Sequence, residues 1–442
     1  MTSELRTLSE GLSDAISDYV SSNPVSKSNH DKASEYFPAG NTRSVLYTSP
    51  FPLTFVSATG ITLTSADGST YLDFLSEYTA GLFGHSNERI KKAIQDVVEG
   101  GWVLGGIGQW EGLFAQRICE RFGLQRCRFT NSGTEANLMT IAVAKAVTKR
   151  KKILVFGGGY HGSVLAFPDV DSQSPMNVPH DFIVGPYNDI KYIKTLQEDP
   201  TTTGDLAAII VEQMQGAGGC YTASNDFLQS LRALADSTGA ILVFDEVMTS
   251  RLHPGGLQAR NGIKPDMTTL GKYLAGGSSF GCFGGKEEIM RVFNEARSDG
   301  GSVLSHAGTF NNNVISMRAG CVAMEILTDE VLENMNKLGA GMREKLNNLF
   351  VKYGVQEKVW ATGVGSLMAI HFGERKGGEW TEYVKARNKS AEELFWFWMI
   401  KNGVYLARRC FVALTIEHRA EHIEQFLNST EEFLEAWSHV LQ

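Results

Sequence analysis

The stretch that decides the fold is residues 241–272, which begins ILVFDEVMTSR and ends MTTLGK. Its first four residues are apolar, and this run stops at Asp245. A short apolar run bounded by polar residues is typical of a buried strand in a parallel sheet. A second such run, 267–270, ends just before Lys272. Open α/β sheets bind ligands at the carboxyl ends of their strands, so we expect Asp245 and Lys272 to lie at a ligand-binding edge.

An aspartate and a lysine at one edge of a sheet suit a particular chemistry. Lysine forms an imine with an aldehyde cofactor, and a carboxylate keeps the pyridine nitrogen of such a cofactor protonated. The ordinary structural explanation is that Asp245 caps the following helix and Lys272 is a solvated surface residue. The two residues alone leave this explanation open, and the rest of the chain favours the chemical one.

The composition limits the kind of protein. A chain of 442 residues, 43% of them hydrophobic, is long enough for two domains with large cores. Its formal net charge of −8 argues against a nucleic-acid or anionic-membrane surface, and no apolar run reaches membrane-spanning length. The six cysteines lack metal-ligand spacing and no secretory leader is present, so we expect a cytoplasmic protein without a metal site.

Strands alternate with helices through the middle of the chain. An amphipathic helical leader is expected at 1–35, and Asp67-Gly68 marks a β-hairpin. The expected strands are 152–156, 182–184, 206–211 and 241–244, with helices at 135–150 and 225–238. This order predicts an α/β protein with a mostly parallel sheet between layers of helices.

The pattern changes after residue 313. Further helices are expected at 314–327 and 332–353, strands at 365–372 and 404–414, and a final helix from residue 420. We therefore expect a large domain at 76–313 and a smaller α+β domain at 314–442, which the N-terminal segment 1–75 and its hairpin join.

Two motifs stand where a phosphorylated ligand with a planar ring would bind. SGT (132–134) opens a helix, and the free backbone N–H groups and positive dipole end of a helix start bind phosphate. Tyr160 follows a strand, where an aromatic ring can stack on a planar ligand. A helix cap and a tight turn are the ordinary explanations of these motifs. The neighbouring His161 is given no catalytic role.

Two more polar residues follow the same logic. Glu212 ends a buried strand and can face the pocket, since a carboxylate cannot lie deep without a partner. Thr309 lies in a polar turn before a helix, where its hydroxyl can donate to a phosphate. A simple strand-end carboxylate and a helix start are the alternatives.

Five stretches follow one another in the order of successive strand ends: NSGTEAN, GGYHG, VFDEVMTSR, TTLGKYLAGG and GTFNNN. Through them the chain resembles the class III aminotransferases of fold type I, which use pyridoxal 5′-phosphate, from about residue 30 to the C-terminus. Within that class it is similar to the glutamate-1-semialdehyde aminomutase-like branch. PAGNTRSVLYTSPFPLTF (38–55) and YLARRCFVAL (405–414) are similar to the β-phenylalanine aminotransferases of that branch.

The resemblance implies a role for each position. Lys272 would form the imine with the cofactor, and Asp245 would pair with its pyridine nitrogen. Val247 and Tyr160 would cover opposite faces of the ring. The residues implied to bind the phosphate are Ser132, Gly133 and Thr134, with Thr309 reaching the phosphate of the neighbouring subunit. The resemblance therefore also implies an obligate homodimer with shared active sites.

Two positions depart from the family pattern. Met248 stands where many class III enzymes have a glutamine near the 3′-oxygen of the cofactor. Gln213 replaces the proline that usually follows the strand-end glutamate, here Glu212. These departures concern local geometry and substrate range rather than the cofactor.

The implied reaction moves an amino group between an amino acid and a 2-keto acid such as 2-oxoglutarate or pyruvate. The expected amino donor is a β-amino acid, an aromatic one being a candidate. An aminomutase of the glutamate-1-semialdehyde type, or a transaminase of ω-amines or α-amino acids, would use the same groups. A cofactor-free binding protein of this fold would have no use for Lys272 and Asp245.

Arginines are the expected ligands of the substrate carboxylates. We interpret Arg43 as the ligand of the β-amino acid carboxylate and Arg409 as the ligand of the keto-acid α-carboxylate. An enzyme that alternates between two carboxylates benefits from a second guanidinium, whereas an aminomutase does not. Adjacent arginines in a strand point to opposite faces, so spacing alone leaves Arg408 equally suitable, and the resemblance favours Arg409.

Overall fold

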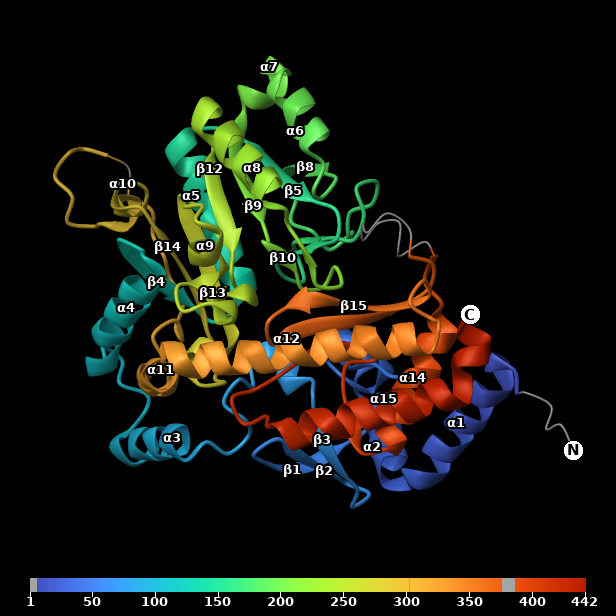
Figure 1. Ribbon diagram of the computed structural model, residues 1–442. Coiled ribbons are helices and arrows are strands. Elements are labelled where there is room, and N and C mark those ends of the chain that lie inside the picture. The colour runs from blue at the N-terminus through green and yellow to red at the C-terminus, as the bar shows by residue number, and fades with distance from the viewer. Residues whose placement is uncertain (1–5, 302, 376–385) are drawn as a thin grey trace, which may run out of the picture. The chain divides into compact units, whose positions relative to one another are not determined.

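The computed structural model describes residues 6–301, 303–375 and 386–442, which form two compact units. Unit 1 comprises residues 6–87, 337–375 and 386–442, and unit 2 comprises residues 88–301 and 303–336. Figure 1 labels their helices and strands. The N-terminal segment and the C-terminal region thus share one unit, as the sequence suggested, but the boundaries fall at residues 87 and 336 instead of 75 and 313.

A seven-stranded sheet forms the centre of unit 2. Its spatial order is β8 (Asp181–Gly185), β5 (Lys152–Phe156), β9 (Leu206–Val211), β12 (Ile241–Asp245), β13 (Met267–Gly271), β14 (Gly281–Gly285) and β4 (Arg126–Thr130). β14 pairs antiparallel with both β13 and β4, and the remaining pairs of the sheet are parallel. The α/β architecture with a mostly parallel sheet is therefore confirmed.

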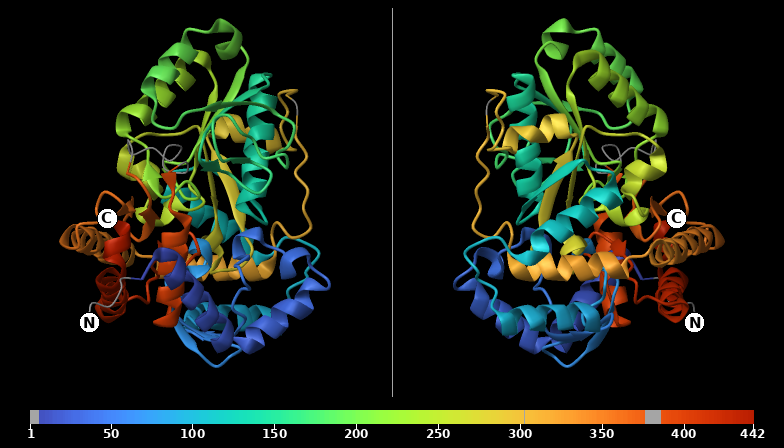
Figure 2. Two further views of the ribbon diagram at one scale, coloured as in Figure 1. Left: turned by 90° about the vertical axis from the view of Figure 1, so that its right-hand side faces the viewer. Right: turned by 90° about the vertical axis from the view of Figure 1, so that its left-hand side faces the viewer.

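Helices cover both faces of this sheet, which explains why its strands read as unbroken apolar runs. On one face α5 (Gly133–Thr148) packs against alternate strand residues such as Ile210 and Val243. On the other face α6 (Ile190–Gln197) and α8 (Asn225–Thr238) pack against the intervening residues, such as Ile209 and Phe244. Figure 2 shows the two helical layers with the sheet between them.

Helix α11 (Val314–Ile326) accounts for the shift of the second boundary. It packs against α3 (Glu88–Gly100), α4 (Gln109–Phe122) and the 3₁₀ turn η5 (Lys272–Ala275). A helix that is apolar nearly all round is buried in a core, and α11 buries eight of its residues from Ser316 to Met324. It therefore belongs to unit 2, and the boundary falls within α12 (Asp329–Lys352).

Unit 1 combines helices with two small sheets. The first sheet has the order β1 (Phe55–Thr59), β2 (Thr62–Ser65), β3 (Thr70–Asp73) and β17 (Val404–Tyr405), with the predicted hairpin at Asp67-Gly68. The second sheet has the order β15 (Val359–Val364), β16 (Leu367–Phe372) and β18 (Phe411–Ala413). The long helices of this unit are α1 (Leu8–Ser22), α2 (Pro24–Ser34), α14 (Lys389–Lys401) and α15 (Ala420–Leu441).

The single strand expected at 404–414 is wrong. The chain forms β17, turns at residues 408–409, and then forms β18 in the other sheet. Cys410 has a φ of 56°, which is incompatible with an extended strand and ends the run. Within the described part of the chain, we find no helix with the length and apolar character needed to cross a bilayer.

Candidate active site

Four adjacent parallel strands of unit 2 bring the predicted residues to one edge of the sheet. β13, β12, β9 and β5 are neighbours, and they run in the same direction. Asp245 is the last residue of β12, Lys272 follows β13 and Glu212 follows β9. The short strand β6 (Gly159–Tyr160) comes three residues after the end of β5. The carboxyl edge of the sheet therefore gathers these groups, as the sequence predicted.

Asp245 is buried in a network of hydrogen bonds. One carboxylate oxygen, Oδ2, accepts a bond from Asn137 Nδ2 at 2.8 Å and lies 2.8 Å from His161 Nδ1. The other, Oδ1, accepts from the backbone N–H of Val247 at 3.0 Å. The explanation that Asp245 caps the following turn thus accounts for Oδ1 but not for Oδ2. Asn137 also accepts a bond from Thr269 Oγ1 at 2.9 Å, which fixes the orientation of its amide.

His161 is the basic partner of Asp245, although no catalytic role was expected for it. Burial alone would lower the pKa of this histidine, but the hydrogen bond and charge of Asp245, assisted by Glu212, outweigh burial and raise the pKa. His161 therefore binds a proton more readily than burial alone would allow. Asn137 was missed altogether, although a buried asparagine among the apolar residues of α5 was an available signal.

Glu212 organises the loop that carries Tyr160. Its Oε1 accepts from the backbone N–H of Tyr160 at 2.9 Å, and its Oε2 accepts from Gly216 N–H at 2.9 Å. Burial raises the pKa of Glu212 to about 7, with His161 opposing the shift and Asp245 adding to it. Tyr160 remains 48% exposed.

The start of α5 lies against Val247, two residues after Asp245. Ser132 caps the helix by accepting from Glu135 N–H at 3.2 Å, so the ordinary cap explanation also holds for its hydroxyl. A Cβ placed on Gly133 would lie 2.8 Å from Val247 Cγ2, and one on Gly162 would lie 2.4 Å from Thr134 Oγ1. Only glycine fits at these two positions, and the helix start, Val247 and the Tyr160 loop form one cluster.

Lys272 stands at the same cluster. A Cβ on the preceding Gly271 would lie 3.5 Å from Val247 Cγ1 and 3.7 Å from the backbone nitrogen of Gly133. Lys272 itself has a φ of 56°, a left-handed conformation that is unfavourable for a residue with a side chain. Met248 packs against Gly216, where an added Cβ would lie 2.2 Å from its sulfur. Both residues are half-buried.

Thr309 lies on the surface of unit 2, next to an exposed Phe310. Its turn is attached to the helix start, because Asn131 Nδ2 donates to Asn311 Oδ1 at 3.0 Å. Asn313 caps α11 by accepting from Ser316 N–H at 2.9 Å, as expected for a polar turn before a helix.

The candidate substrate arginines belong to unit 1. Arg43 forms an ion pair with Glu77. The Arg409 guanidinium carbon lies 5.7 Å from the ring centroid of Tyr78 and 5.5 Å from that of Phe411. The two adjacent arginines lie in a turn, so the expectation that they point to opposite faces of a strand is wrong.

Arg408 is occupied by contacts within unit 1. It donates to the backbone oxygen of Ser49 at 2.7 Å, pairs with Glu393 at 3.1 Å and lies over the rings of Trp396 and Phe397. These contacts give Arg408 a structural role. They favour Arg409 as the arginine of the pair that serves a ligand.

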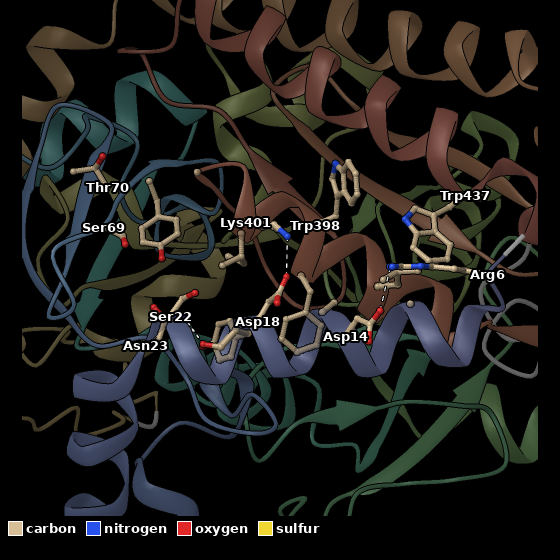
Figure 3. Close-up of a pocket in the computed structure, with 18 residues that line it drawn as sticks. Arg6, Asp14, Asp18, Ser22, Asn23, Ser69, Thr70, Trp398, Lys401 and Trp437 are labelled. Atoms are coloured by element: carbon tan, nitrogen blue, oxygen red, sulfur yellow. Dashed lines mark hydrogen bonds and ion pairs between the residues drawn. The ribbon is translucent and has the colours of Figure 1, made fainter. Parts of the chain in front are cut away.

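A cavity of about 560 Å³ lies elsewhere in unit 1, beside α1 and α14 (Figure 3). Two exposed ion pairs stand at its rim, Arg6 with Asp14 at 3.1 Å and Lys401 with Asp18 at 2.8 Å. Among the described residues that line it, none is predicted for the site.

Comparison with known proteins identifies the family to which the chain belongs. The model of the class III aminotransferases matches residues 46–433. The β-phenylalanine transaminase of Variovorax paradoxus is 42% identical over 431 residues, 97% of this chain and 96% of that protein. A solved β-phenylalanine aminotransferase from Variovorax paradoxus superposes with a TM-score of 0.93 at 41% identity, over 98% of this chain and 99% of that chain. The glutamate-1-semialdehyde 2,1-aminomutase of Methanothermobacter thermautotrophicus is 33% identical over 426 residues, 91% of this chain and 97% of that protein.

The groups at the sheet edge fit pyridoxal 5′-phosphate. A helix start at Ser132 offers backbone N–H groups to a dianionic phosphate. A buried carboxylate held by Asn137 and His161 suits a protonated pyridine nitrogen, and a lysine amine suits an aldehyde. The chain therefore belongs to the class III aminotransferases of fold type I, and it is a transaminase whose cofactor is pyridoxal 5′-phosphate.

Proposed function

We propose that this transaminase takes the amino group of a β-amino acid, an aromatic one included, and passes it to a 2-keto acid. The observation that carries the proposal is the pair of separate guanidinium groups beside one turn of unit 1, Arg43 at Glu77 and Arg409 at Tyr78. A donor and an acceptor that each bear a carboxylate need such groups. The name of the Variovorax paradoxus relative supports the same substrate class.

We also propose roles for the residues at the sheet edge. When bound, the cofactor accepts the electrons released as the substrate loses a proton. Lys272 would hold the cofactor aldehyde through its amine at rest. Once the substrate amine had displaced it, the freed amine of Lys272 would remove the proton from the substrate carbon that bears nitrogen. Asp245 holds a proton on the pyridine nitrogen, and Asn137 and His161 hold Asp245 in place.

The remaining groups bind and orient. The N–H groups at Ser132, Gly133 and Thr134 bind the phosphate, and Tyr160 and Val247 cover the two ring faces. Glu212 holds the loop that carries Tyr160. Met248 would supply an apolar contact at the position where many class III enzymes have a glutamine near the 3′-oxygen of the cofactor.

A homodimer in which Thr309 serves the site of the partner subunit is part of the same proposal. Unit 2 exposes apolar side chains in the loop after α3, with Val103 80% and Ile107 88% exposed, and Phe310 beside Thr309 is 64% exposed. Such exposed apolar residues are typical of an interface. Sedimentation of an Ile107→Glu, Phe310→Glu double variant should show monomers with little activity, whereas an active monomer would contradict the dimer.

We further propose that the enzyme works in the cytoplasm. All six cysteines have free thiols, and they lie in the described part of the chain. Free thiols are typical of proteins kept in a reducing compartment. Fractionation of the source cells with an antibody would test the location.

The substrate proposal is tested by measuring the two half-reactions separately. Arg43→Ala should lower kcat/KM for β-phenylalanine, and Arg409→Ala should lower it for 2-oxoglutarate, each by roughly 10- to 100-fold, as expected for loss of a charge-assisted bidentate pair. Arg408→Ala, whose arginine is bound to Ser49 and Glu393, is the matched control and should change neither half-reaction more than about threefold. Equal effects of the first two variants on both half-reactions would contradict the division of roles. Product formation without any keto acid would indicate an aminomutase instead.

A further inference from the structure

The turn that touches both candidate arginines has an unusual backbone. Four consecutive residues, none of them glycine, lie in the left-handed region: Ser76 at φ 50°, Glu77 at 48°, Tyr78 at 50° and Thr79 at 83°. Residues with a side chain adopt this conformation rarely, and a run of four is unfavourable unless the surroundings impose it. Backbone outliers of this kind are concentrated at functional sites.

The surroundings do impose this conformation. Asp73 Oδ1 accepts from the backbone N–H groups of Leu75 at 2.8 Å and of Ser76 at 2.9 Å. Ser76 Oγ donates to the backbone oxygen of Ala413 at 2.8 Å, which ties the turn to β18. Ser76 and Thr79 are fully buried, whereas Glu77 between them is exposed. These hydrogen bonds hold the turn in place and leave the Glu77 side chain in solvent.

The two central side chains of this turn contact different arginines. The Glu77 carboxylate pairs with Arg43, and the Tyr78 ring lies beside Arg409. Tyr78 also donates from its hydroxyl to the backbone oxygen of Val45 at 3.2 Å, so the turn is bonded to the segment that carries Arg43. Residues 76–79 therefore contact both arginines.

The Arg43–Glu77 pair is accessible to a ligand. The Arg43 side chain is 43% exposed and the Glu77 side chain is 52% exposed. An exposed ion pair is weak, because water and salt compete with it, so an incoming carboxylate can take the place of Glu77 at small cost. Without Glu77 the positive charge of Arg43 would have no neighbouring negative charge from that side chain. It would then attract the incoming carboxylate more strongly.

We propose that Glu77 determines substrate selectivity as an exchangeable counter-ion. It neutralises Arg43 when no carboxylate is bound and gives way to the substrate carboxylate, so it weakens the binding of carboxylates relative to neutral ligands of the same shape. The inference rests on the proposed role of Arg43, and it adds a role for Glu77, the carboxylate that pairs with Arg43. A glutamate that merely orients Arg43 would have the opposite effect, since its loss would weaken carboxylate binding.

The experiment uses the holoenzyme and two probes of one shape, 3-phenylpropanoate and 3-phenylpropanamide, as competitive inhibitors of β-phenylalanine turnover. Glu77→Gln keeps the shape of the side chain and removes its charge. It should lower the inhibition constant of the carboxylate, and KM for β-phenylalanine, by about 2- to 5-fold, the range expected for an exposed pair. The inhibition constant of the amide should not fall. Raising the salt to about 1 M should shrink the difference between variant and parent, because the Debye length is then about 3 Å.

Two control variants separate the possible failures. Asp18→Asn removes a similarly exposed carboxylate of unit 1, paired with Lys401, and should leave both inhibition constants unchanged. Arg43→Gln should raise the inhibition constant of the carboxylate and abolish the effect of Glu77→Gln in the double variant. If Arg43→Gln has no effect, the proposed role of Arg43 fails. If Arg43→Gln weakens carboxylate binding but Glu77→Gln leaves it unchanged or also weakens it, only the counter-ion role of Glu77 is overturned.

Discussion

Two neighbouring threonines of β13 offer a matched test of the network around Asp245. Thr268 and Thr269 are both fully buried, and each donates one hydrogen bond of 2.9 Å to a side-chain amide oxygen. The acceptor of Thr268 is Gln258, away from the site, whereas the acceptor of Thr269 is Asn137, which donates to Asp245. Replacing either threonine by valine keeps the shape and removes one donor.

The two variants should lose similar stability and differ in function. Each leaves one buried amide oxygen without its donor, which costs about 1–3 kcal/mol in the free energy of unfolding. In Thr269→Val the Asn137 amide is also free to turn away from Asp245. Weakening that bond by about 1 kcal/mol should raise the Kd of pyridoxal 5′-phosphate and lower kcat/KM by roughly 5-fold. Thr268→Val should change both by less than about twofold.

The assays are urea unfolding of the apoenzyme, fluorescence titration with the cofactor, and steady-state kinetics at saturating cofactor. Unequal losses of stability would show that the two hydrogen bonds are not equivalent, and the comparison would then need correction by that difference. A Thr269→Val variant that loses stability but binds the cofactor like the parent would contradict the role of Asn137 in holding Asp245. Equal weakening of cofactor binding by Thr268→Val would contradict it as well.

Three further outcomes follow from the site. Lys272→Ala should abolish transamination yet bind the cofactor without a covalent bond, seen as a cofactor that borohydride no longer fixes to the protein; turnover near the parent rate would contradict the assignment. Because burial raises the pKa of Glu212 from 4.5 to about 7, its charged form disfavours the fold, and the free energy of unfolding should fall as pH rises from 4.5 through 7. Urea unfolding between pH 5 and 8 should show a shallower decline in Glu212→Gln, and identical slopes would exclude this contribution. Gly133→Ala places a Cβ 2.8 Å from Val247, so cofactor affinity measured by titration should fall at least about 10-fold, and Val247→Ala in the same chain should restore part of it.

The sheet and its edge could be predicted from the sequence because burial on both faces leaves a clear signal. Runs such as 206–211 and 241–244 are apolar without a break, and each stops at a carboxylate. Strand order and direction then bring the strand ends together without any knowledge of side-chain contacts. The helix 225–238 was also predicted to the residue, since Gly239 in the left-handed conformation ends it.

Other features depend on tertiary contacts that local patterns do not record. The backbone of residues 76–79 is imposed by Asp73 and by the distant Ala413, so nothing in SEYT itself indicates a left-handed turn. The break at Cys410 and the contacts of Arg408 depend in the same way on residues far along the chain. The role of Asn137 was missed because one asparagine in an apolar helix does not reveal its partners.

The pairing of β3 with β17 has a consequence for synthesis on the ribosome. These parallel strands join residues Thr70–Asp73 to Val404–Tyr405, so the second strand emerges 331 residues after the first ends (404 − 73). At about 5–20 residues per second, the early hairpin waits roughly 15–70 s for its partner strand. All seven strands of the central sheet of unit 2 lie between residues 126 and 285, so this sheet can close during that wait. The edge of β3 that pairs with β17 lacks its partner strand during that wait, and an unpaired strand edge is prone to pair with other chains.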